Sequence, residues 1–205
     1  PYDISRIDFD LLKREFERSQ RKKTTVQNMR QALEDRLQRM LAQNPLRTNF
    51  QQHFEEIVTE YNREKDRVTI EKTFEELLRL TEALDEEEER AVREGLNMES
   101  LAIFDLLKKP ELQASEITKI KSIAVDLLAT LKAEKLRIDQ WRDKEATRDA
   151  VKLSIRNFLY GDEKGLPVTC YSEEEMMERA DNVFRHVYRS YPTLPSPYYQ
   201  DAAVA

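Results

Sequence analysis

Glycine is scarce in this chain of 205 residues, which contains only Gly95, Gly161 and Gly165. Tight turns between strands commonly need glycine, and a phosphate-binding loop needs several glycines close together. Segments rich in Glu, Lys, Arg, Leu and Ala, all common in helices, fill most of the chain. We therefore predict an all-α fold, a multi-helix bundle of about eight to nine helices with a non-helical C-terminal tail.

Apolar residues recur at helical spacing through most of the chain and define the expected helices. These helices cover about residues 8–23, 24–43, 44–62, 68–84, 85–94, 98–108, 115–138, 139–160 and 172–191. Local capping and stop signals predict helix boundaries at Asn44, at Asp85 with Glu88, at Gly95 and Asn97, and at Ser172 with Glu175.

The tail differs from the rest of the chain because it holds three prolines within PTLPSP. It should be extended or disordered, or dock as a strip on a neighbouring domain. We therefore divide the chain into a helical assembly domain at residues 1–191 and a tail at 192–205. Because the chain begins at Pro1 rather than Met, we interpret it as a piece of a longer polypeptide.

The net charge of −6 argues against a generic nucleic-acid binder, but the charges are unevenly distributed. Residues 13–39 include nine Lys and Arg against four Asp and Glu, whereas residues 55–94 include seven against fifteen. A basic arm joined to an acidic body suits a protein that touches DNA at one end and protein elsewhere. It equally suits two solvated helix faces that differ in charge.

Basic residues near the start of the chain are the candidates for contact with DNA. In a helical projection, Arg14, Arg18 and Arg21 fall on the face opposite to the apolar residues of the helix expected at 8–23. Such a face could neutralise phosphates and gain affinity by counterion release, or it could be solvated surface paired locally with Glu15 and Glu17. The full set of candidate DNA-binding residues is Arg14, Arg18, Arg21, Lys22, Lys23, Arg36 and Arg39.

Two further arginines and the two histidines are interpreted as structural. Arg30 and Arg148 are in phase with apolar stripes, so we expect ion pairs there, or an Arg30 side chain that reaches past the core to solvent. His53 flanks an apolar stripe and His186 is expected to face solvent. Neither position predicts chemistry.

Patterns that carry catalysis, metal binding or cofactor binding are not found in the sequence. Cys170 is the only cysteine, so an internal disulfide is excluded, and no base in the sequence marks it as a nucleophile. Walker-type and histidine metal motifs are missing. We expect no catalytic residue, metal or cofactor and do not expect this chain to be an enzyme, although carboxylates or Cys170 could still converge in three dimensions.

Apolar runs in the chain fall short of the roughly 18 residues that a membrane-spanning helix needs. A signal peptide is not recognisable either. We therefore predict a cytoplasmic protein without membrane contact.

Four blocks of sequence, taken together, carry a family resemblance. They are NPLRTNFQQHFEEIVTEYN, REGLNMESLAIFDLLKKP, LKAEKLRIDQWRDKEATRDAVKLSIRNFL and GLPVTCYSEEEMMERADNVFRHVYRSY. In this order, they resemble the C-terminal helical region of type I restriction enzyme motor (R, or HsdR) subunits. The resemblance covers nearly the whole chain, but the nuclease and helicase motifs of that family lie in other domains and are missing here.

The resemblance implies a non-catalytic assembly domain within an ATP-dependent type I site-specific deoxyribonuclease. Its expected partners are the methyltransferase core (modification and specificity subunits), other domains of the motor subunit, and duplex DNA bound without sequence specificity. Alternatively, the domain only braces the helicase domains of its own subunit and does not touch DNA. The positions that match the family blocks look mainly structural, among them Asn44, Pro45, Arg47, Tyr61, Asn62, Trp141 and Arg148.

Overall fold

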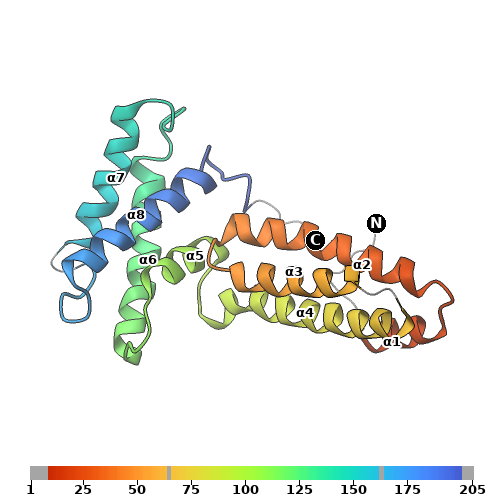
Figure 1. Cartoon of the computed structure of the whole chain (residues 1–205). Helices are drawn as coiled ribbons and strands as arrows, with labels where there is room; N and C mark the ends of the chain where they lie inside the picture. Colours follow the sequence, from red (N-terminus) through yellow and green to blue (C-terminus); the bar gives the residue numbers. More distant parts are fainter. Residues whose placement is uncertain (1–8, 64–65, 162–163, 200–205) are drawn as a thin grey trace. The chain divides into compact units, whose positions relative to one another are not determined.

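The chain is all-α, as predicted. The computed structural model describes residues 9–63, 66–161 and 164–199, and the regular structure in these ranges is helical throughout. Figure 1 shows the eight helices described, which are α1 (Phe9–Arg18), α2 (Lys22–Gln43), α3 (Thr48–Arg63), α4 (Arg67–Arg93), α5 (Met98–Leu107), α6 (Ala114–Glu134), α7 (Glu145–Leu159) and α8 (Glu173–Ser190).

The helices group into two compact units, each with its own hydrophobic core. The first unit comprises residues 1–41 and 47–90, and so includes α1, α3 and most of α2 and α4. The second unit comprises residues 42–46 and 91–205, and includes α5 to α8. Both units are therefore discontinuous in sequence.

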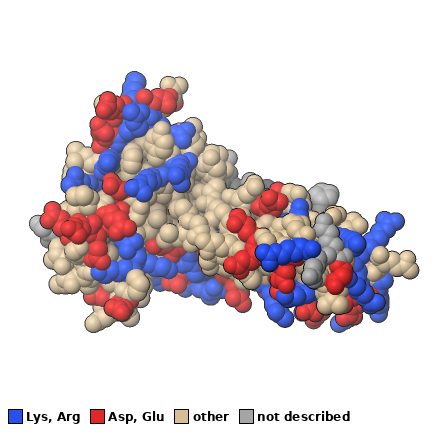
Figure 2. All heavy atoms as spheres, viewed as in Figure 1, with Lys and Arg blue, Asp and Glu red and all other residues tan. Residues whose placement is uncertain are grey.

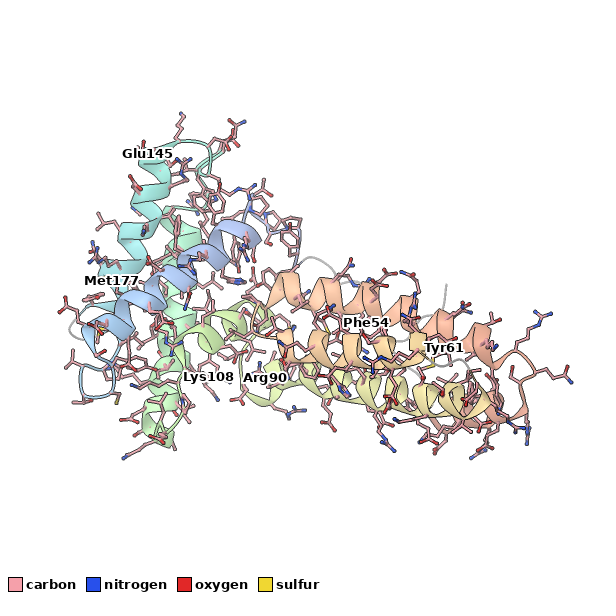
Figure 3. All side chains as sticks on the ribbon, in the orientation of Figure 1. Phe54, Tyr61, Arg90, Lys108, Glu145 and Met177 are labelled. Atoms are coloured by element: carbon pink, nitrogen blue, oxygen red, sulfur yellow. The ribbon has the colours of Figure 1, made fainter. Side chains whose placement is uncertain are left out.

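The core of the first unit is formed by one face from each of its four helices. Helix α3 contributes Phe54, Ile57 and Tyr61, which recur at helical spacing in its sequence. Figure 3 labels Phe54 and Tyr61 on this helix. Helix α1 is attached through Phe16, whose ring stacks on that of Phe74 of α4 with centroids 3.7 Å apart.

Helix α3 begins at Thr48, so the start predicted at Asn44 is wrong. Asn44 is buried in the second unit, where its side-chain oxygen accepts a hydrogen bond from the Leu46 amide and its Nδ2 donates to Asp105 Oδ2 at 2.7 Å. The asparagine therefore closes a local turn and satisfies a buried carboxylate instead of capping the helix.

Helix α4 runs without a break through the acidic stretch, so the helix start predicted at Asp85 is also wrong. Glu88 follows Asp85 at position i+3, so the two carboxylates lie on the same side of this helix. They bind Arg36 of α2 instead, with Nη2 of the arginine 2.6 Å from Asp85 Oδ1 and 2.8 Å from Glu88 Oε2. Glu87 accepts from Arg47 at 2.9 Å, which ties the turn before α3 to α4.

Arg36 is only 6% exposed, so it is a buried cation. Burial opposes its charged form, but hydrogen bonds and the charges of Glu88 and Asp85 outweigh this effect and raise the pKa of Arg36 above its ordinary value. The arginine therefore stays charged, and its two carboxylate partners compensate for the cost of burying it.

The second unit follows its local sequence signals closely at several helix ends. Asn97 and Ser172 cap the starts of α5 and α8, as predicted, and each of them forms a capping box. Gly95 adopts a positive φ of 69°, consistent with the predicted end of α4. Eight of the ten residues of α5 are buried, and this short helix packs against α6 and α8.

The helix predicted over residues 139–160 is wrong in its first part. Residues 135–144 form turns, and α7 begins only at Glu145. Gln140 has a φ of 52°, which a right-handed helix cannot accommodate. The turns bury Trp141, whose Nε1 donates to the carbonyl of Tyr191 at 2.9 Å.

The tail is non-helical where it is described, at residues 192–199, and it packs on the second unit. Ser196 is buried and donates to the carbonyl of Ser190. Tyr199 donates its hydroxyl to the carbonyl of Gln43, while Gln43 Nε2 donates to the carbonyl of Tyr198 at 2.9 Å. These contacts anchor the second half of the described tail.

Removal of the two carboxylates that bind Arg36 should destabilise the protein. We expect the double variant Asp85→Asn/Glu88→Gln to lose about 2 kcal/mol of unfolding free energy, because the arginine would remain buried without its anionic partners. Urea unfolding followed by circular dichroism measures this loss.

The matched control removes two exposed carboxylates from the same unit. Glu56 and Glu75 lie 3.8 Å and 3.9 Å from their basic neighbours at the surface. The variant Glu56→Gln/Glu75→Gln should lose less than about 1 kcal/mol. Equal losses of unfolding free energy in the two double variants would show that the Arg36 ion pairs stabilise the fold no more than exposed ion pairs do.

Candidate nucleic-acid interface

The first two helices are joined by a short turn that determines where the candidate basic residues lie. Helix α1 ends at Arg18 and α2 begins at Lys22, whereas the sequence predicts one helix to residue 23. Ser19 Oγ accepts from the amide of Arg21 at 3.0 Å and stabilises the turn. Arg21 therefore lies in the turn, and only Arg14 and Arg18 lie on α1.

Four basic side chains around this turn form what we call the α1–α2 basic surface: Arg14, Arg18, Arg21 and Lys23. All four are exposed. In the part of the chain that the structure describes, none of them has a carboxylate within ion-pair distance. In Figure 2, blue Lys and Arg side chains gather at the right-hand end of the view, where Figure 1 draws α1 and the start of α2, with red side chains among them.

Lys22 is held differently from its neighbours, although it is also a candidate. Its Nζ donates to Glu71 Oε1 at 2.7 Å and lies 5.1 Å from the centroid of the Phe16 ring. Hydrogen bonds from Lys22 and then Arg67 hold the pKa of Glu71 below its ordinary value, so this carboxylate is charged. Lys22 thus helps to attach the start of α2 to α4, and its charge is already balanced.

Arg36 and Arg39 do not extend the α1–α2 basic surface. The Arg36 guanidinium is buried against two carboxylates, so it cannot meet a phosphate without leaving them. Arg39 is exposed, but it lies about 24 Å further along α2 than Lys23 and is rotated by about 160° around the helix axis. The seven candidates therefore divide into four exposed residues around the first turn and three separate positions.

The other two arginines singled out in the sequence have no ion pair among the described residues. Arg148 is half-buried and its Nη1 donates to the carbonyl of Arg142 at 2.7 Å. Arg30 is also half-buried, which fits a side chain that reaches past the core toward solvent.

His186 is buried rather than solvent-facing, so that prediction is wrong. It is 3% exposed. Its Nδ1 lies 3.3 Å from Ser190 Oγ and its Nε2 lies 3.2 Å from the hydroxyl of Tyr199 in the tail. Desolvation, with a smaller effect of the Arg189 charge, lowers the pKa of His186 to about 4. His53, in contrast, is exposed on α3.

Cys170 lies in the loop before α8 and contacts one carboxylate. Its Sγ donates to Glu116 Oε1 at 2.6 Å, and this bond, followed by the hydrogen bond from the Gln113 amide, lowers the pKa of Glu116. Among the described residues, no group of three or more His, Cys, Asp or Glu side chains could hold a metal ion. None of the described helices is both long enough and apolar enough to cross a bilayer.

A surface hollow between α7 and α8 was not recognised from the sequence. It includes Leu153 and Met177, which are 57% and 43% exposed. The available signal was that Leu153 falls outside the buried stripe of Val151, Ile155 and Leu159. A single apolar residue outside a stripe is common, so the hollow becomes visible only when α8 is placed beside α7.

Comparison with known proteins identifies a family. The family described as "Type I restriction enzyme HindI endonuclease subunit-like, C-terminal" matches residues 1–189 of the chain. No curated protein and no solved structure matches the chain.

The buried histidine predicts a specific dependence of stability on pH. Above pH 6.5 His186 is neutral in both the folded and the unfolded chain, so it has no effect. Between pH 6.5 and about 4 the histidine is protonated in the unfolded chain but remains neutral in the folded chain. The free energy of unfolding should therefore fall as the pH is lowered, by roughly 3 kcal/mol in total. Urea unfolding at a series of pH values measures this slope.

The slope can be assigned with two single variants. His186→Gln should remove this component and leave the smaller contribution of the carboxylates. His53→Gln, at an exposed histidine, should keep the slope of the unaltered protein. If His186→Gln retains the full slope, the histidine is not the group that titrates.

Proposed function

Because the chain belongs to the type I restriction enzyme HindI endonuclease subunit-like C-terminal family, we propose that it is a non-catalytic assembly domain of the motor subunit. In this role it attaches the motor subunit to the methyltransferase core of modification and specificity subunits. It also places the α1–α2 basic surface against duplex DNA, without reading the base sequence.

The DNA contact is supported by the contrast between the α1–α2 basic surface and other cations of the first unit. Arg36, Arg47 and Lys22 are each bonded to a carboxylate of α4. The four residues of the α1–α2 basic surface have no such partner among the described residues. Their charges are free to neutralise phosphates and release counterions.

Non-specific binding fits the way this surface is built. Two of its residues lie on a helix of ten residues and two lie in or just after a turn, all with long side chains at the surface. Such side chains reach phosphates readily, whereas base readout requires a helix or a strand placed in a groove. Because the total charge of the chain is −6, we expect the attraction to DNA to come from a local surface and not from the chain as a whole.

The docking role rests on the family and on the sequence resemblance to motor subunits. The family is described as part of an endonuclease subunit, which implies that the parent protein works in an assembly. In the resembled enzymes, the C-terminal helical region helps to attach the motor subunit to the methyltransferase. The competing function, a brace for the helicase domains of its own subunit, requires neither methyltransferase nor DNA contact.

Reversal of the α1–α2 basic surface tests the DNA contact. We expect the unaltered chain to shift a random duplex in a gel, with a slope of log affinity against log salt of roughly −3 to −4 for four phosphate contacts. The quadruple variant Arg14→Glu/Arg18→Glu/Arg21→Glu/Lys23→Glu should give no shift at the same protein concentration.

A second quadruple variant controls for the change in net charge. Arg137, Lys144, Arg185 and Arg189 are exposed residues of the second unit. Their reversal to Glu makes the same change in total charge but should leave most of the salt-dependent binding intact. Equal loss in both variants, or binding without salt dependence, would mean that the α1–α2 basic surface is only solvated.

Docking is tested in the complete motor subunit. Deletion of this domain should abolish co-purification with the methyltransferase core while the ATPase activity of the remaining subunit persists. The brace function predicts the opposite result, with association retained and the helicase domains destabilised.

A further inference from the structure

The hollow on α7 and α8 of the second unit is an apolar surface that none of the described residues of this unit fills. Its volume is about 590 Å³. Three alanines, Ala146, Ala150 and Ala180, leave room for an approaching helix, and Leu153 and Met177 stand exposed beside them. Figure 3 labels Met177 on α8 and Glu145 at the start of α7. A helix could pack here closely because small residues alternate with larger apolar ones.

The charges on α7 are arranged symmetrically around the exposed leucine. Asp149, Leu153 and Arg156 are spaced at i, i+4 and i+7, so they lie on one face of the helix. Asp149 and Arg156 are about 10 Å apart along the axis. Both are exposed, and among the described residues neither has an opposite charge within ion-pair distance.

The remaining charged pair in the hollow is already neutralised within one chain. Lys152 Nζ lies 3.5 Å from Asp181 Oδ1 of α8. If a second copy of the chain brought two Lys152 side chains together, each of them would still have its own Asp181 beside it. The charges of this face that have no ion-pair partner among the described residues are thus one acid and one base, with an apolar side chain between them, and the base lies 5.9 Å from the ring centroid of Tyr160.

We propose that a second copy of this chain binds here, with α7 packed antiparallel on α7 about a two-fold axis near Leu153. The antiparallel order places Asp149 of each copy opposite Arg156 of the other, so two equivalent ion pairs form. The two Leu153 side chains meet at the axis and are removed from water. A two-fold contact of this kind uses the same surface on both molecules.

Charge complementarity favours this occupant over an unrelated helix. The order acid, leucine, base on α7 is its own complement when reversed, and a parallel arrangement would instead bring like charges together. Exposed ion pairs are weak, and the apolar part of the surface is small. The dimer should therefore be weak and depend on concentration and on salt.

Sedimentation equilibrium of the whole chain over a range of concentrations tests the proposal. We expect reversible dimerisation in the unaltered protein. The single variants Asp149→Arg and Arg156→Asp should each raise the dimer dissociation constant by about tenfold, because two attractions become two repulsions. The double variant Asp149→Arg/Arg156→Asp should dimerise like the unaltered protein.

Mixing the two single variants gives the sharpest result. Each is repelled by its own kind, but the two are complementary to each other, so their mixture should form dimers that neither forms alone. The matched controls Asp139→Arg and Arg137→Asp change exposed charges in the turn before α7 and should have no effect.

Two results would overturn the proposal. One is a strictly monomeric chain at every concentration, which would leave the hollow for a different protein such as a methyltransferase helix. The other is a dimer that is insensitive to both single variants, which would place the contact elsewhere. Neither result bears on DNA binding by the first unit, because the two tests use separate residues.

Discussion

The first unit depends on how α4 accommodates buried arginines. Arg36 has lost nearly all contact with water, so α2 can pack on α4 only where carboxylates replace the water. Asp85 and Glu88 do this from a single helical turn, which requires the acidic stretch to remain helical. Glu87, on the same turn, accepts from Arg47 ahead of α3. One turn of α4 therefore binds arginines from both neighbouring segments, while Glu86, Glu88 and Glu89 of the acidic stretch remain exposed.

The same pairing separates structural cations from available ones. Residues 55–94 carry an excess of acidic side chains, but part of this negative charge is neutralised by arginine and lysine within the unit. The sequence charge of this segment therefore does not give the charge of its surface. What remains after this pairing is an uneven surface, with Arg14, Arg18, Arg21 and Lys23 exposed around the first turn. The local charge of this surface, and not the charge of the whole chain, decides whether it can attract a phosphate backbone.

Features that depend on neighbouring residues could be predicted from the sequence, and features that depend on distant ones could not. The caps at Asn97 and Ser172 and the end of α4 near Gly95 are local, and they are found as expected. Asp85 with Glu88 has capping spacing too, but Arg36, 49 residues from Asp85, uses these carboxylates. His186 is covered by Tyr199 of the proline-rich tail. Its burial therefore could not be predicted from its neighbours on α8. At the candidate site, helical periodicity predicted that Arg14 and Arg18 lie opposite the apolar face of α1, and both are exposed. The turn at Arg21 and the burial of Arg36 depend on the tertiary fold.

The five residues 42–46 belong to the second unit although both flanking segments belong to the first. The chain therefore passes from one unit to the other at three places, near residues 41, 46 and 90. A simple cut at residue 90 would not yield two complete domains. It would leave Gln43 and Asn44 on the wrong fragment, and so deprive the tail and Asp105 of the groups that bind them. During synthesis, residues 42–46 leave the ribosome more than 100 residues before Tyr199, which binds Gln43. This segment can therefore complete its contacts only after nearly the whole chain has been made.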